Sequence, residues 1–160
     1  MSSTLYVDKI VEKTSAAGVH IPGHVIQTVH ANSSVTRVTT SSTTYINTGL
    51  TATITPTSTT SKILVVVQHT GLAASAGNCY LNLMLADGSG TELLSLETQA
   101  GYMPSHAAER SIGGTGSSYL HSPSTTSAIT YKTMFKLSGT TSGNVFVEKQ
   151  AGITLMEIAG

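Results

Sequence analysis

Residues 127–158 read SAITYKTMFKLSGTTSGNVFVEKQAGITLMEI, and this stretch decides the fold class. Its first eleven residues alternate between two sets, Ile129, Tyr131, Thr133, Phe135 and Leu137 against Ala128, Thr130, Lys132, Met134 and Lys136. This period of two is typical of a strand with one buried face. Turn residues at 138–143 and 150–151 separate it from two further strand patterns, 144–149 and 152–158. Since a free terminal strand would fray, we expect the last strand to be paired and buried.

The chain before residue 127 also has strand patterns and no helical stripe. Ile63–Val67 is apolar at every position, which predicts a central strand covered on both faces. Residues 78–86 and 91–99 flank Asp87–Gly90, a hairpin signal. Residues 100–126 are rich in glycine and predict loops, with one short strand at 117–121. About eight strands after residue 23 predict an all-β, antiparallel two-sheet β-sandwich of jelly-roll type.

The composition favours a protein whose surface is used by neighbours. Only 10% of the 160 residues are charged, the net charge is zero, and 47 residues are Ser or Thr. A free monomer with so few charges would have poor colloidal stability. Assembly is therefore the favoured interpretation, and an ordinary secreted β-domain is the alternative. The single cysteine, Cys79, cannot form an intrachain disulfide, and its strand pattern with Leu81 and Leu83 predicts burial.

Several function classes lack their usual signals. The sequence has no basic stripe, so we expect no nucleic-acid binding. It has no long apolar run, so we expect no membrane insertion, and its first residues do not resemble a signal peptide.

The first 23 residues predict an extended N-terminal docking arm outside the main domain, which would comprise residues 24–160. Four of the sixteen charged side chains fall within the first thirteen residues, and Pro22-Gly23 closes the segment with a turn signal. An extended arm can add a strand to the sheet edge of a neighbouring subunit. The predicted docking side chains are Leu5, Tyr6, Val7, Ile10, Val11, Val19 and Ile21.

Catalytic signatures are weak. The two aspartates, Asp8 and Asp87, lie in the arm and at a hairpin tip, so a serine–histidine–aspartate relay is not expected. The six histidines lack metal-ligand spacing, although a fold could gather His69, His106 and His121. Glu92, Glu97 and Glu109 could pair for glycoside cleavage, but the chain has no Trp to form a sugar platform. We therefore expect a non-enzymatic protein with no catalytic residues, no cofactor and no metal.

One loop cluster, Tyr102-Met103-Pro104, is apolar. It is a candidate exposed contact loop. A lid on one end of the sandwich is the equal alternative.

Several segments together resemble small virion structural proteins of tailed bacteriophages, especially marine and cyanobacterial phages. The resemblance covers most of the chain and rests on strand and turn signatures. The segments are TLYVDKI at 4–10, IPGHVIQ at 21–27, YINTGLTATITP at 45–56, SKILV at 61–65, SPSTTSAITYK at 122–132 and ITLMEI at 153–158.

The resemblance implies a β-sandwich that assembles as a homotrimer and a short N-terminal piece that docks on the particle. Such proteins are tail fibres or other virion structural proteins. The chain has no coiled coil and no shaft repeat, which favours a capsid decoration or cement protein over a long fibre. The expected partners are further copies of the chain and a major capsid or tail protein. The expected location is the virion, after synthesis in the host cytoplasm.

The alternative is a receptor-binding tail fibre or adhesin. In that case, the loops at 71–78, 100–118 and 121–127 would contact the host surface, and a host surface glycan is a candidate ligand.

Overall fold

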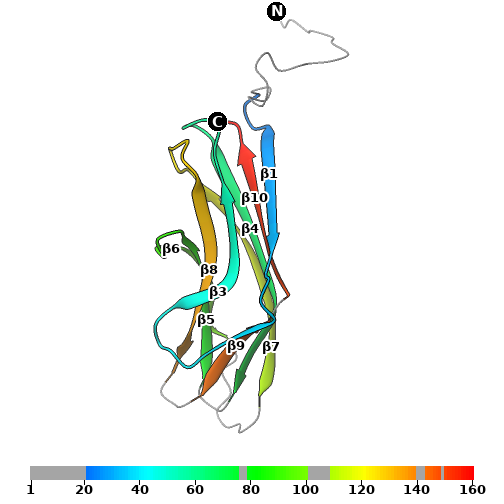
Figure 1. Cartoon of the computed structure of the whole chain (residues 1–160), viewed down its shortest axis with the longest axis vertical. Coiled ribbons are helices and arrows are strands. Elements are labelled where there is room, and N and C mark those ends of the chain that lie inside the picture. The colour runs from blue at the N-terminus through cyan, green and yellow to red at the C-terminus, as the bar shows by residue number, and fades with distance from the viewer. Residues whose placement is uncertain (1–20, 76–78, 101–108, 140–142, 149) are drawn as a thin grey trace, which may run out of the picture.

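The computed structural model describes residues 21–75, 79–100, 109–139, 143–148 and 150–160. These residues form ten strands and no helix, so none of them lies in a helix that could cross a membrane. The strands, shown in Figure 1, are β1 (Val25–Asn32), β2 (Arg37–Thr40), β3 (Ile46–Ile54), β4 (Lys62–Ser75), β5 (Tyr80–Asp87), β6 (Glu92–Ala100), β7 (Arg110–His121), β8 (Ile129–Ser138), β9 (Asn144–Glu148) and β10 (Ala151–Ile158).

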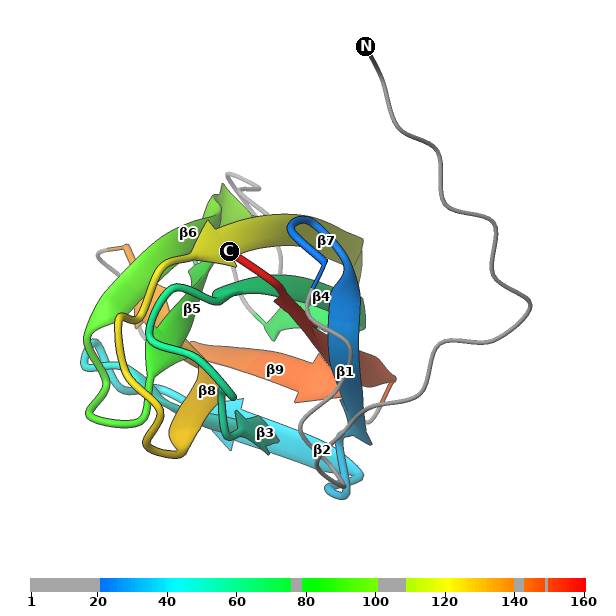
Figure 2. The ribbon, with the colours of Figure 1, turned by 90° about the horizontal axis from the view of Figure 1, so that it is seen from above.

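The strands form two antiparallel sheets. One sheet has the order β3-β8-β5-β6. The other has the order β1-β10-β4-β9-β2, and β7 also pairs with β4. Seen end-on, the two sheets enclose a common interior (Figure 2).

The second sheet has four strand positions, although it contains six strands. The long strand β4 pairs with β7 on one side, and on its other side with β10 first and then with β9. The edge position is divided in the same way, because β1 pairs with β10 and β2 pairs with β9. The fold is therefore a sandwich of four strand positions against four, with the connectivity of a jelly roll. This confirms the predicted fold class.

A glycine permits the change of partner along β4. A Cβ atom on Gly71 would lie 2.4 Å from Cβ of Glu148, so no side chain fits where β4 passes from β10 to β9.

The interior contains two clusters of buried side chains. Residues in β3, β4, β5, β8 and β10 form one cluster, which includes Leu50, Val65, Tyr131 and Leu155. Residues in β4, β5, β8 and β9 contribute to the other, which includes Leu83, Phe135 and Val147. The predicted alternation in β8 is confirmed, because Tyr131, Thr133, Phe135 and Leu137 are buried while the intervening residues are partly exposed. Cys79 is buried, as predicted.

Two strand predictions require correction. Ile63, Val65 and Val67 are buried, but Val66 is 37% exposed, so none of the described residues forms a second layer over the outward face of β4. The glycines at 113, 114 and 116 are part of β7, which begins at Arg110 and not at Ser117. Pairing with β4 outweighs the local preference of these glycines for loops. Residues 71–75 and 110–118, assigned above to host-contacting loops, are therefore strand residues for the most part.

Candidate interaction surfaces

Residues 21–23 lie at the same end of the sandwich as the last residues of the chain (Figure 1). The Gly23 amide donates a hydrogen bond to the Ala159 carbonyl at 2.8 Å, and the Ala159 amide donates to the His24 carbonyl at 2.9 Å. The His24 amide donates to the Ile21 carbonyl at 2.9 Å, and Gly23 has a φ of +80°, which favours glycine. This turn holds residues 21–24 against the last residues of the chain.

Of the predicted docking residues, only Ile21 lies within the described part of the chain, and its side chain is 49% exposed. Leu5, Tyr6, Val7, Ile10, Val11 and Val19 lie outside the described residues, as do Tyr102, Met103 and Pro104 of the predicted contact loop. The division of the chain at residue 23 stays a prediction.

A buried carboxylate stabilises the end of the sandwich at which residues 21–23 lie. Glu157 on β10 is fully buried. Its Oε2 accepts a hydrogen bond from Nε2 of Gln27 on β1, and its Oε1 accepts from the Thr57 amide and hydroxyl, both at 2.7 Å. Burial raises the pKa of Glu157, but these hydrogen bonds outweigh it and hold the pKa below its ordinary value. The carboxylate thus joins β1, β10 and the β3–β4 connection.

Replacing Glu157 by glutamine is expected to lower the free energy of unfolding by about 1–3 kcal/mol, because the new amide group faces hydrogen-bond donors. Because the folded pKa is depressed, the advantage of the wild type is complete above about pH 4.3, the ordinary value, and decreases as the pH falls through the folded pKa. Urea unfolding of both proteins across this range measures the difference. The same change at exposed Glu92 is the control. A difference that does not vary with pH would contradict this assignment.

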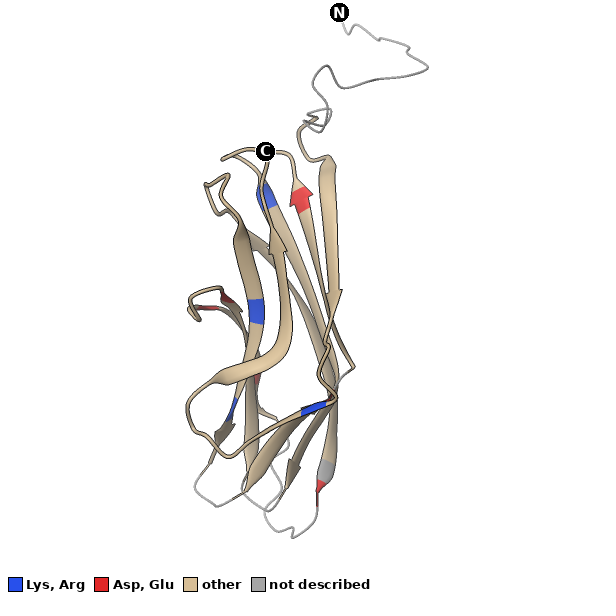
Figure 3. Cartoon of the chain, viewed as in Figure 1, with Lys and Arg blue, Asp and Glu red and all other residues tan. Residues whose placement is uncertain are grey.

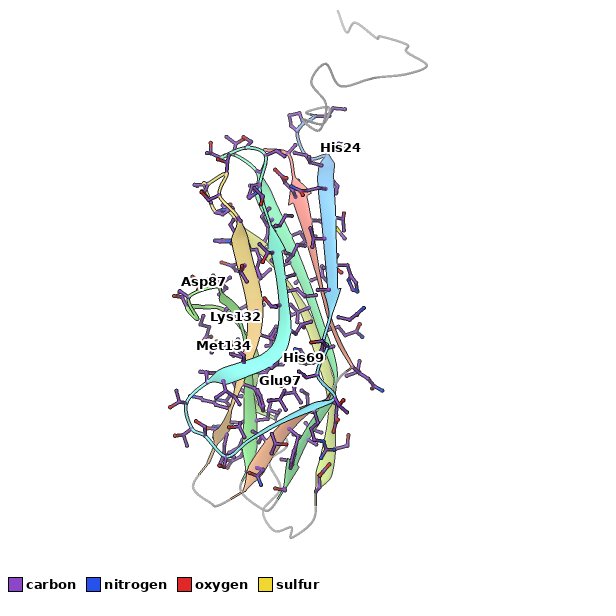
Figure 4. All side chains as sticks on the ribbon, in the orientation of Figure 1. His24, His69, Asp87, Glu97, Lys132 and Met134 are labelled. Carbon is purple, nitrogen blue, oxygen red and sulfur yellow. The ribbon has the colours of Figure 1, made fainter. Side chains whose placement is uncertain are left out.

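His69 lies between the two sheets, 2% exposed (Figure 4). Its Nε2 is 3.0 Å from the hydroxyl of Thr133 on β8, which is 2.6 Å from the hydroxyl of Thr48 on β3. Burial lowers the pKa of His69 to about 4, so the imidazole is neutral at physiological pH. This chain of polar groups connects β4 to the opposite sheet and is closed to solvent.

Two of the three histidines that a fold could have gathered, His69 and His121, are described by the structure and lie apart. His121 pairs with Ile63 at one end of the β4 ladder and His69 with Thr115, so the two histidines are about 20 Å apart along the strand. His121 Nδ1 is 2.8 Å from the hydroxyl of Tyr131, and burial lowers the pKa of His121. No group of three or more His, Cys, Asp or Glu within the described ranges could hold a metal ion. His106 lies outside these ranges.

The three glutamates considered for glycoside cleavage have different environments. Glu109 makes two hydrogen bonds of 2.9 Å with the guanidinium of Arg37, which also pairs with Glu148 and lies over the ring of Phe146. The bonds from Arg37 lower the pKa of Glu109. Glu92 and Glu97 lie on β6, in the other sheet. Glu109 therefore shares a cation with Glu148 and does not lie in the same sheet as Glu92 and Glu97.

Sequence reasoning missed Glu157. A signal was present, because the alternation of Ile153, Leu155 and Glu157 places the carboxylate on the buried face of β10.

Strand order and connectivity define the class of the chain as a jelly-roll β-sandwich. The sequence matches no family model and no curated protein.

Similar solved structures come from infectious bursal disease virus. The VP2 subviral particle has a TM-score of 0.52 and 11% identity over 84% of this chain. Structures of the Gx and Gt strains of this virus each have a TM-score of 0.52 and 10% identity over 100% of this chain. The chain spans about a third of the length of these neighbours, 33%, 38% and 37% respectively. At these identities, the likeness shows a common fold.

Proposed function

We propose that this chain is a non-enzymatic structural component of a virus particle. It docks on the particle through its leading segment, residues 1–23, and self-associates through its sandwich. It would act as a capsid decoration or cement protein or as a short fibre. The observation that carries the proposal is the fold, because the similar structures are viral capsid proteins and cover up to the whole chain. The resemblance of the sequence to phage virion proteins favours a tailed bacteriophage as the source.

The position of residues 21–23 at one end of the sandwich supports a docking role for the leading segment. Residues 1–20 precede a turn that is hydrogen bonded to the C-terminal end of the sandwich. A docking segment at one end leaves the other end of the domain free of this contact. In an oligomer, the weak docking contacts of several copies act together and raise the avidity by effective concentration. A major capsid or tail protein is the proposed partner.

Removal of residues 1–20 is expected to abolish saturating binding to particles assembled without this chain, with a loss of apparent affinity of at least about 100-fold. The deletion stops before Ile21 so that the turn bonded to Ala159 stays intact. Binding is measured by cosedimentation, and an unchanged melting temperature shows that the sandwich is folded.

Paired point variants separate the role of the apolar side chains from that of chain length. Leu5→Asp with Val7→Asp should reproduce the deletion, whereas Ser2→Asp with Ser3→Asp adds the same charge in the same segment and should bind normally. Full occupancy by the truncated protein would contradict the docking role.

A host-receptor-binding module is the second candidate. It is favoured by one observation: the strand ends at Ser75, Ala100, Ser138 and Asn144 all lie at the end of the sandwich opposite Ile21 (Figure 1). These strand ends therefore lie far from Ile21. A second experiment distinguishes this candidate. Purified protein is added to host cells before the phage, and phage adsorption is measured. Only an adhesin is expected to lower adsorption.

A further inference from the structure

The large hydrophobic side chains that are exposed among the described residues belong to one sheet or to the residues just before its strand β1. They are Ile21, Val25, Val66 and Leu120, which are 49%, 42%, 37% and 50% exposed. Val25 begins β1, Val66 lies on β4 and Leu120 lies near the end of β7, and these three strands belong to the same sheet. Because Val65 and Val67 are buried, Val66 points away from the core.

The strand register places Val66 and Leu120 on one continuous outward face. Leu64 of β4 pairs with Leu120 of β7 and Met156 of β10, which makes one apolar row across three strands. The next row contains Val66 between Ser118 and Thr154. We call this surface the outer face, made of the outward residues of β1, β10, the first half of β4 and the second half of β7.

Glycines flatten the outer face beyond these rows. Gln68 pairs with Gly116 of β7 and Gly152 of β10, so it has no side chain beside it on either strand. Two shallow depressions result, and both are lined by Gln68 and Thr70.

The outer face is almost free of charge. Lys62, the first residue of β4, is the single Lys, Arg, Asp or Glu among the outward positions of these four strand segments. The opposite sheet differs, because the outward positions of β8 include Lys132 and Lys136, and β6 contains Glu92 and Glu97. In Figure 3 the sheet of β1, β10 and β4 has a blue segment on β4, which is Lys62, and a red one on β10, which is Glu157, whose side chain is buried.

The polar side chains of the outer face bind one another. His30 is 2.9 Å from the Thr154 hydroxyl through Nδ1 and 3.2 Å from Asn32 Oδ1 through Nε2. The Thr70 hydroxyl donates to the Gln150 carbonyl at 2.7 Å. Burial of this surface would therefore leave few of these polar groups without a partner, which keeps the desolvation penalty low.

We propose that the outer face packs against a second copy of this chain. The inference rests on the self-association included in the proposed function, and it assigns the surface. A surface with almost no charge can meet its own copy without like-charge repulsion, whereas the opposite face could do so only by desolvating the ammonium groups of Lys132 and Lys136.

The size of the outer face also fits a second copy. Four strands of about eight residues have a planar footprint of about 500 Å². Side-chain relief adds to this, so the accessible area approaches the roughly 800 Å² per partner of a standard interface.

Charge insertion tests the assignment. Val66→Glu with Leu120→Glu is expected to convert an oligomer of the 16.5 kDa chain into a monomer at micromolar concentration, measured by light scattering. The control pair, Ser95→Glu with Thr98→Glu, adds the same charges at exposed positions of β6 and should leave the oligomer intact. Melting curves show that each variant is folded, and Val66→Thr with Leu120→Thr, which adds no charge, should weaken the oligomer to a smaller degree.

Three results would overturn the assignment. A monomeric wild type would exclude a second copy. An oligomer that persists in the Val66→Glu, Leu120→Glu variant would place the interface elsewhere. Conversion to a monomer by deletion of residues 1–20 alone would show that the leading segment makes the contact. Failure of an intact oligomer to bind particles would instead refute the proposed function and leave this assignment standing.

Discussion

Acidification from about pH 7 to about pH 4 is expected to lower the free energy of unfolding by about 3 kcal/mol through His69 alone. The imidazole is buried and neutral, with a pKa of about 4 in the folded chain. In the unfolded chain, a histidine has a pKa of about 6.5, so the unfolded state takes up a proton first as the pH falls. Stability therefore rises with pH between these two values and is lost as the pH falls through them.

The variant His69→Met separates this contribution from those of other groups. Methionine fills a similar volume without titrating, and the Thr133 hydroxyl retains Thr48 as a partner. Burial also lowers the pKa of His121, which acts in the same direction in both proteins. Urea unfolding at a series of pH values should therefore show a smaller acid-induced loss in His69→Met than in the wild type. Exposed His24→Met is the control, and equal losses in the wild type and His69→Met would refute the assignment.

Replacing Phe135 by alanine is expected to lower the free energy of unfolding by about 3–5 kcal/mol. The ring is fully buried in the cluster that joins β8 to β4, β5 and β9. Its removal loses transfer free energy and leaves a cavity that surrounding strands close only in part.

Met134 provides the matched control, because it precedes Phe135 on the same strand and points to the opposite face. Met134 is partly exposed (Figure 4), so Met134→Ala is expected to have an effect of about 1 kcal/mol or less. Thermal unfolding of the two variants compares them directly. Similar losses in both would contradict the inward orientation of Phe135.

The contrast between these neighbours explains why the sequence predicts the fold class well. In β8, each inward residue is apolar or a hydrogen-bonded threonine, and each outward residue tolerates solvent, so the local pattern and the tertiary environment agree. The hairpin at Asp87 was predicted for the same reason. Its carboxylate accepts hydrogen bonds from the amides of Ser89, Gly90 and Thr91, each at 2.9 Å.

Predictions that depended on distant partners were less reliable. The glycines at 113, 114 and 116 give a local loop signal, but pairing with β4 makes them strand. The apolar run Ile63–Val67 predicted cover on both faces, whereas Val66 is exposed in the single chain. A second copy on the outer face would cover Val66, so the apolar run would then have cover on both faces, as its sequence predicts.

The candidate sites were only partly predictable. Most of the predicted docking side chains lie outside the described residues, and only Ile21 can be located. The outer face could not be found from sequence, because it requires the register of β4 with both β7 and β10. Spacing along the chain cannot place Leu64 beside Leu120 and Met156.

The most direct test of a structural role in the virion is a density map of the intact particle. We expect jelly-roll density for this chain, with residues 1–20 in contact with a capsid or tail protein and the outer face covered by another copy. Purified particles that do not contain the chain would contradict the proposed function.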